Sequence, residues 1–167
     1  MIDQAISFTP ATAAAPLPRP SSPQAHRILV AEDDEDIRRL NTEALLQSGY
    51  QVDGAEHGAA AWESLQLKRY HLLITDNDMP MLTGVGLLKK LRAARMDLPV
   101  IMATGTVPAD EFTRNPALLP AAVLIKPYTI DELLGAVREV LRVTEVAPDE
   151  TPPETWQNQQ PTDGWQL

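Results

Sequence analysis

The chain has 167 residues, carries 23 Asp and Glu against 14 Lys and Arg for a formal net charge of −9, and contains no cysteine. The missing cysteine excludes disulfides and thiolate metal sites, the acidic balance argues against nucleic-acid binding, and no apolar run approaches the roughly 18–20 residues of a membrane span. We therefore expect an acidic, cytoplasmic protein with one domain and with no nucleic-acid or membrane partner.

Proline and charge divide the chain into three parts. Five of the 15 prolines lie in residues 1–25, and residues 144–167 carry five acidic side chains and no basic one. Segments with many prolines and few apolar residues do not bury enough surface to offset the entropy of ordering. We expect a disordered Pro- and Ala-rich tail over residues 1–25, a folded domain over residues 26–145 and an acidic Pro- and Gln-rich tail over residues 146–167.

Apolar runs alternate with helical periodicity in the middle of the chain. In chain order the pattern predicts a strand over Ile28–Ala31, a helix through Ile37, Leu40, Ala44 and Leu45 that Gly49 ends, a strand over Gln51–Ala55, a helix over Ala59–Lys68, a strand over Leu72–Thr75, a helix over Gly84–Arg95 and a strand over Val100–Ala103.

The last elements are a helix over Val107–Leu119 that Pro116 breaks, a strand over Ala122–Ile125, and a helix that starts at Thr129. Thr129 and Glu132 form a capping-box pattern at that start. Five strand–helix units predict right-handed crossovers and a parallel α/β sheet covered on both faces, with its ligand site at the carboxyl ends of the strands.

Polar and charged side chains follow four of these strands. Glu32 and Asp33 follow the first, Asp76 the third, Thr104 the fourth and Lys126 the fifth. Because neighbouring carboxylates repel one another, a shared site favours a bound divalent cation, and oxygen ligands suit Mg²⁺. A neutralised carboxylate is then able to act as a nucleophile on a phosphoryl group, with the lysine and the hydroxyl as donors to its oxygens.

Four stretches, "RILVAEDDEDIRRL", "LLITDNDMPMLTG", "VIMATG" and "VLIKPY", make residues 27–143 resemble the receiver domain of bacterial two-component response regulators. The resemblance implies a flavodoxin-like (βα)5 fold with strand order 2-1-3-4-5. It implies that Asp76 accepts a phosphoryl group from the phosphohistidine of a sensor kinase. It also implies a Mg²⁺ ligated by Asp33 and Asp76, by Glu32 through water, and by the backbone carbonyl of Asp78.

Three further positions take their roles from the same resemblance. Thr104 matches the switch hydroxyl and Lys126 the motif lysine, whose bond to Pro127 would be cis. The family usually has Tyr or Phe three residues before that lysine, where this chain has Val123. Val123 either packs in its strand or marks a different coupling between Asp76 and the surface that binds partners.

The resemblance implies a single-domain response regulator that either switches partner binding or relays phosphate, rather than an enzyme, with slow autophosphatase activity at most. Its partners would be a sensor histidine kinase or a histidine phosphotransfer protein and an unknown downstream protein, and it would be a monomer or a weak homodimer. Two alternatives stay open: a phosphorylation-independent receiver-like adaptor, and a phosphatase of the haloacid-dehalogenase type, which also uses Asp-x-Asp, Thr and Lys. Trp156 and Trp165 in the acidic tail either dock on their own domain or form a linear docking motif.

Overall fold

The computed structural model describes residues 26–146. The two predicted tails, with Trp156 and Trp165, lie outside the described residues. The elements are β1 Arg27–Ala31, α1 Glu35–Gln47, β2 Gln51–Ala55, α2 Gly58–Leu67, β3 Leu72–Asp76, α3 Gly84–Ala93, β4 Val100–Thr104, α4 Ala109–Arg114, the 3₁₀ turn η1 Pro116–Leu118, β5 Ala122–Ile125 and α5 Ile130–Val146.

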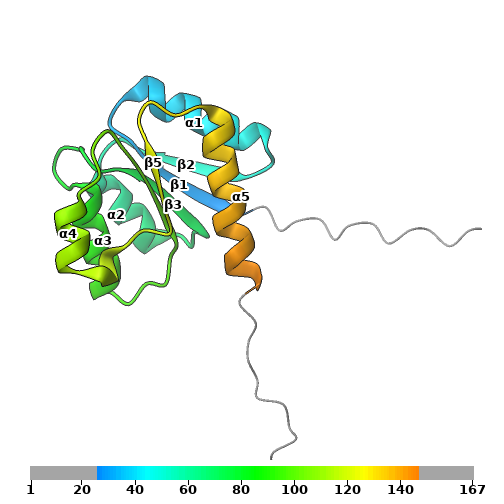
Figure 1. The fold of residues 1–167 in the computed structure, drawn as a ribbon. Helices are drawn as coiled ribbons and strands as arrows, with labels where there is room; N and C mark the ends of the chain where they lie inside the picture. The colour runs from blue at the N-terminus through cyan, green and yellow to red at the C-terminus, as the bar shows by residue number, and fades with distance from the viewer. Residues whose placement is uncertain (1–25, 147–167) are drawn as a thin grey trace, which may run out of the picture.

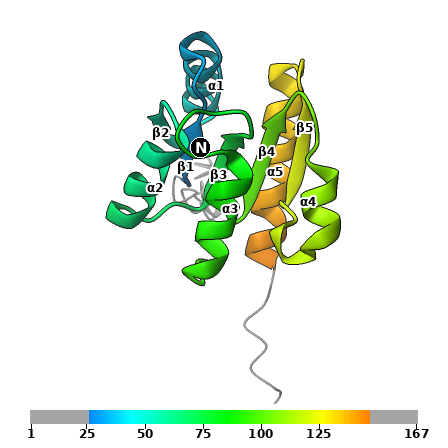
Figure 2. The same ribbon diagram turned by 90° about the vertical axis from the view of Figure 1, so that its left-hand side faces the viewer.

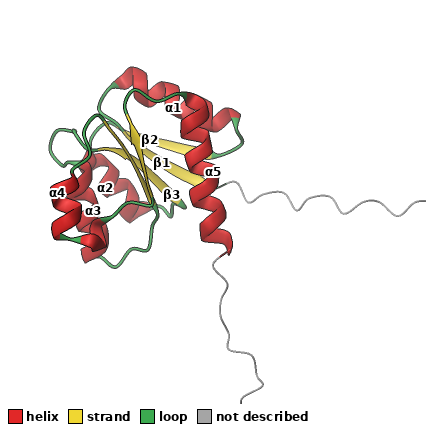
Figure 3. Cartoon of the chain, viewed as in Figure 1, coloured by secondary structure: helices red, strands yellow, loops and turns green. Residues whose placement is uncertain are grey.

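The five strands form one parallel sheet in the order β2-β1-β3-β4-β5, as the resemblance implied. Figure 2 shows this order across the molecule. Helices α1 and α5 cover one face of the sheet, and α2, α3 and α4 cover the other (Figures 1 and 3). The predicted α/β sheet covered on both faces is therefore confirmed.

Side chains alternate between two apolar layers, one on each face of the sheet. Ile28 and Val30 join the layer under α1 and α5, whereas Leu29 and Ala31 of the same strand join the layer under α2 and α3. Because successive residues of a strand point to opposite faces, a short continuous apolar run suits a strand that is buried on both sides. All five residues of β3 and all five of β4 are buried for this reason.

Most of the predicted elements appear within two residues of their expected ends. β3 and β4 each run one residue further than predicted, so that Asp76 and Thr104 are the last residues of their strands. Pro116 breaks the predicted fourth helix: α4 has six residues, and η1 begins at the proline. Within residues 26–146, no helix is both long and apolar enough to cross a membrane.

Candidate functional site

The site is built where the parallel strands end. β1 ends one residue before Glu32, β3 ends at Asp76, and β5 ends one residue before Lys126. Backbone hydrogen bonds extend the sheet pairing into these loops, from Glu32 N to Ala55 O at 3.1 Å and from Lys126 N to Thr104 O at 2.9 Å. The sheet itself therefore fixes the starting point of each functional side chain.

Lys126 joins two acids that come from different strands. Its Nζ donates to Glu32 Oε2 and to Asp76 Oδ2, each at 2.8 Å. The side chain of Glu32 is 3% exposed and that of Asp76 is 9% exposed, whereas that of Lys126 is 22% exposed. Buried acids almost always need a partner of opposite charge, and here one ammonium group serves both.

Burial and charge shift two of these groups. Desolvation raises the pKa of Glu32 above its usual range, although hydrogen bonding and attraction to Lys126 oppose the shift. For Lys126 desolvation acts to lower the pKa, but the hydrogen bonds and charges of Asp76 and Glu32 outweigh it and raise the pKa. The lysine therefore stays charged, while the ionised Glu32 is held at an energetic cost that a cation would relieve.

A third carboxylate opens the cluster to solvent. Ligand atoms of Glu32, Asp33 and Asp76 all lie within 4.8 Å of one another, and Asp33 is exposed while the other two are buried. Hard oxygen donors of this kind, in a site with a solvent-facing side, suit Mg²⁺ because this ion keeps several waters and binds through one or two carboxylates. The donor set therefore fits the ion that the sequence led us to expect.

Arg38 of α1 holds the backbone of the two acids that precede its helix. Its Nη1 donates to Glu32 O at 2.6 Å and to Asp33 O at 3.3 Å. Asp34 caps the helix by accepting from the N–H groups of Asp36 and Ile37. The guanidinium thus fixes the loop that presents Glu32 and Asp33, a role that we did not predict from the sequence.

The loop after β3 is arranged around Asp76. Asp78 N donates to Asp76 Oδ1 at 3.1 Å, so one carboxylate oxygen is bound by the loop and the other by Lys126. Gly84 at the start of α3 lies so close that a Cβ there would come 2.5 Å from Asp76 O. Only glycine allows this approach of helix to strand. The Asp78 side chain is exposed, and the role expected for its carbonyl stays a prediction.

Asn77 connects this loop to the next helix. Its Oδ1 accepts from Val85 N at 3.2 Å, in the first turn of α3, and its Nδ2 donates to Asp78 Oδ1 at 3.3 Å. The sequence showed a polar residue here without a reason for it. The amide side chain binds an N–H group that the helix itself leaves free, which ties the position of α3 to the residue next to Asp76.

The Thr104 hydroxyl is hydrogen-bonded within its own loop and not to Asp76. This buried group donates to Thr106 O at 3.0 Å and accepts from Thr106 N at 3.3 Å. Val123, at the expected switch position, is 36% exposed on the edge strand β5. The predicted cis bond between Lys126 and Pro127 is present. The structure thus brings together the side chains of Glu32, Asp33, Asp76 and Lys126, while the Thr104 hydroxyl is engaged within its own loop, and the roles expected for Thr104 and Val123 stay predictions.

Tyr128 and Asn41 form a buried polar pair beside the site that the sequence did not indicate. Asn41 of α1 is 2% exposed, and its Nδ2 donates to the Tyr128 hydroxyl at 2.8 Å. Burial raises the pKa of Tyr128, so the phenol stays neutral and remains available as the acceptor. This contact joins α1, which carries Arg38, to the segment that follows Lys126.

Comparisons of the sequence with known proteins point to one family. A family model described as the response regulator receiver domain matches residues 28–138. The response regulator receiver protein CpdR of Brucella abortus is 36% identical over 115 residues, which are 69% of this chain and 96% of that protein.

Two solved structures show the same fold. The receiver domain of the Francisella response regulator 1452 superposes with a TM-score of 0.65 at 28% identity, covering 71% of this chain and 98% of that one. The response regulator TrrA of Thermotoga maritima, solved with Mg²⁺ and BeF, gives a TM-score of 0.60 at 28% identity and covers 69% of this chain and 98% of its own.

Proposed function

Because the chain belongs to the response regulator receiver domain family, we propose that it is a phosphoryl acceptor of two-component signalling and that Asp76 is the residue modified. Its protein partners are then a sensor histidine kinase or a histidine phosphotransfer protein upstream and a protein target downstream. The expected cytoplasmic location belongs to the same proposal.

The observation that carries the proposal is the shared lysine. A buried carboxylate that only stabilised the fold would be expected to have a cationic partner of its own. Asp76 instead shares one with the buried Glu32, because Lys126 Nζ lies 2.8 Å from an oxygen of each acid. Two acids on one ammonium group leave excess negative charge beside a solvent-facing third acid. Such an excess is costly without a cation, so the arrangement favours a binding function over a structural one.

The proposed chemistry uses the carboxylate of Asp76, whose two oxygens accept hydrogen bonds from Asp78 N and from Lys126 Nζ. A carboxylate oxygen of Asp76 forms a bond to phosphorus as the phosphorus–nitrogen bond of phosphohistidine breaks, and the imidazole nitrogen leaves with the electron pair and takes up a proton. Lys126 is then free to donate to the transferred group. Glu32, Asp33 and Asp76 would hold Mg²⁺, which supplies charge neutralisation for the phosphoryl oxygens.

The hydroxyl of Thr104 belongs to a later stage of this proposal. To donate to a phosphoryl oxygen, it would have to give up the hydrogen bond that it now donates to Thr106 O. That movement would change the loop between β4 and α4, and this change is what a downstream partner would detect. Val123 lacks the ring that usually follows such a movement in the family, so the loop itself would carry more of the signal.

Intact mass measures the proposed modification. The full chain is incubated with acetyl phosphate and Mg²⁺, together with Asp76→Asn and with Asp131→Asn, a matched change at an exposed carboxylate of α5. We expect one added phosphoryl mass in the wild type and in Asp131→Asn, none in Asp76→Asn, and none when a chelator removes Mg²⁺. An adduct that persists in Asp76→Asn would overturn the assignment.

A second candidate, a receiver-like adaptor that works without phosphorylation, rests on Val123 and on the engaged Thr104 hydroxyl. It predicts that a partner captured by the wild type binds Asp76→Asn with the same affinity whether or not acetyl phosphate is present. The phosphoswitch predicts that acetyl phosphate changes the affinity of the wild type alone.

A further inference from the structure

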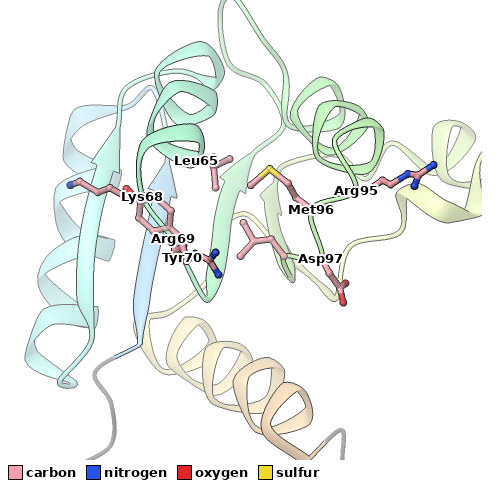
Figure 4. A pocket seen from close by; sticks show the side chains of 8 residues that line it. Leu65, Lys68, Arg69, Tyr70, Arg95, Met96 and Asp97 are labelled. Carbon is pink, nitrogen blue, oxygen red and sulfur yellow. The ribbon is translucent and has the colours of Figure 1, made fainter. Parts of the chain in front are cut away.

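A hollow of about 490 Å³ lies at the edge of the sheet opposite to the acidic site. It is lined by the end of α2, by the residues that lead into β3, and by the segment between α3 and β4. Figure 4 shows it from close by. This is the amino edge of the parallel strands, so no residue of the proposed phosphoryl-transfer site contributes to it.

The inner wall of the hollow is apolar. Leu65 is 4% exposed and Leu98 is 6% exposed, and both belong to the apolar layer under α2 and α3. Met96 is partly buried against the same layer, and Figure 4 shows its thioether beside Leu65. A methionine next to leucines makes an adaptable surface that packs well against an aromatic ring.

The polar rim has an excess of basic side chains and is formed by Lys68, Arg69, Tyr70, Arg95 and Asp97. Lys68 Nζ and the Tyr70 hydroxyl both donate to Asp53 Oδ2, at 3.1 and 2.8 Å, so these two groups are already bound. Within residues 26–146, the guanidinium groups of Arg69 and Arg95 have no hydrogen bond and no ion pair. The Arg69 side chain lies beside Tyr70, whereas that of Arg95 points outward (Figure 4).

The segment after α5 has the complementary chemistry. Residues 147–167 contain four acidic side chains and no basic one, and they contain Trp156 and Trp165. Each tryptophan follows an acid by two positions, in Glu154-Thr155-Trp156 and in Asp163-Gly164-Trp165. If such a segment bound in an extended form, residues at this spacing would point to the same side, so that the acid and the indole would meet one surface together.

The tether is long enough for the first of these pairs. α5 starts after β5 at the carboxyl edge of the sheet and returns to the amino edge, where the hollow lies. The nine residues 147–155 span about 30 Å when extended, which matches the width of a domain with a radius of gyration of about 13 Å. A short tether also gives Trp156 a higher effective concentration at the hollow than Trp165.

We propose that the segment around Trp156 docks into this hollow, with the indole against Leu65, Met96 and Leu98 and the Glu154 carboxylate on Arg69. The acidic tail is then an intramolecular ligand of its own receiver domain. The contact leaves the acidic edge of the sheet open, so docking and phosphorylation are compatible.

Nuclear magnetic resonance of the full ¹⁵N-labelled chain tests the contact. We expect Trp156→Ala to shift the amide signals of the lining residues Leu65, Tyr70, Met96 and Leu98, and the matched change Trp165→Ala to leave them in place. Unchanged signals in Trp156→Ala would overturn the proposal, as would shifts that appear only in Trp165→Ala. Shifts that disappear on dilution would assign the hollow to a second copy of the chain and would also contradict it.

A charge exchange tests the pairing separately. Arg69 is exposed and has no partner among the described residues, so Arg69→Glu is expected to fold normally. It should move the Trp156 indole signal toward that of a solvent-exposed tryptophan, and adding Glu154→Arg should move it back. The indole of Trp62, on α2, serves as an internal reference; it is covered by the ammonium group of Lys90 from α3. A Trp156 signal that stays in place in both variants would contradict the pairing of Arg69 with Glu154.

Discussion

At the scale of single residues, Arg38 and Arg39 show how similar neighbours differ in role. Arg38 donates to the carbonyl oxygens of Glu32 and Asp33, and its aliphatic part lies over Gly54 of β2. Among the described residues, Arg39 forms only an ion pair with Asp36, and the two side chains are 67% and 87% exposed, respectively. Exposed pairs of this kind contribute little to stability. Arg38 is therefore a positioning residue for the acidic loop.

We expect Arg38→Ala to weaken Mg²⁺ binding by about tenfold, because residues that orient metal ligands typically contribute 10–100-fold to metal affinity. Isothermal titration of Mg²⁺ measures the effect, and circular dichroism checks that the fold is kept. Arg39→Ala is the matched control and should bind Mg²⁺ as the wild type does. Equal affinities for the two variants would show that the loop holds its shape without Arg38.

At the scale of the elements, helix starts are fixed by local side-chain contacts. The capping box that the sequence predicted at α5 is present: Thr129 N donates to Glu132 Oε2 at 2.7 Å, and Glu132 N donates to Thr129 Oγ1 at 3.2 Å. These hydrogen bonds lower the pKa of Glu132. α5 begins at Ile130, three residues after Pro127, so its start also defines the end of the loop that carries Lys126.

Thr129→Ala should reduce the free energy of unfolding by about 1 kcal/mol, since it removes the capping hydroxyl from the start of α5. Chemical denaturation followed by circular dichroism measures the change. Thr113→Ala is the matched control, because the Thr113 hydroxyl is exposed and donates only to Ala109 O within α4. A loss in the control as large as that in Thr129→Ala would mean that capping does not explain it.

The elements also show what a sequence is able to predict. Apolar runs such as that of β1 and the pattern at Thr129 are local signals, and both led to elements that the structure confirms. That Glu32, Asp76 and Lys126 lie close together could be predicted from the parallel topology and from the family motifs. The roles of Arg38, Asn77 and Asn41 did not follow, because each depends on which backbone or side-chain atom faces it across a loop.

At the scale of the whole molecule, a second polar cluster lies away from the acidic site and consists of Asp53, Lys68 and Tyr70. Asp53 of β2 accepts from Lys68, at the end of α2, and from Tyr70, two residues before β3. Burial raises the pKa of Tyr70 to about 12, and the hydrogen bond to Asp53 and the charge of Asp53 add to the shift. For Asp53 itself, desolvation acts to raise the pKa, but hydrogen bonds to Tyr70 and Lys68 outweigh it and lower the pKa.

Asp53→Asn should therefore lower the stability of the domain at pH 7, by roughly 1 kcal/mol, because it weakens the hydrogen bonds that this half-buried carboxylate accepts from Tyr70 and Lys68. A carboxyl with a depressed pKa contributes stability above its unfolded pKa of about 4 and loses it as the pH falls through the folded value. The difference between variant and wild type should then shrink below about pH 4. Urea denaturation at several pH values measures it, and a difference independent of pH would refute this electrostatic origin.

The hydrogen bonds of Lys126 have a consequence for the order in which the molecule is made. Lys126 lies 94 residues after Glu32 and 50 after Asp76, so the site joins parts of the chain that are synthesised far apart in time. Contacts of such long sequence separation form late, because closing large loops is slow. An incomplete nascent chain holds the acids but not their ammonium partner, so the capacity to receive a signal would arise only after the last strand has been placed.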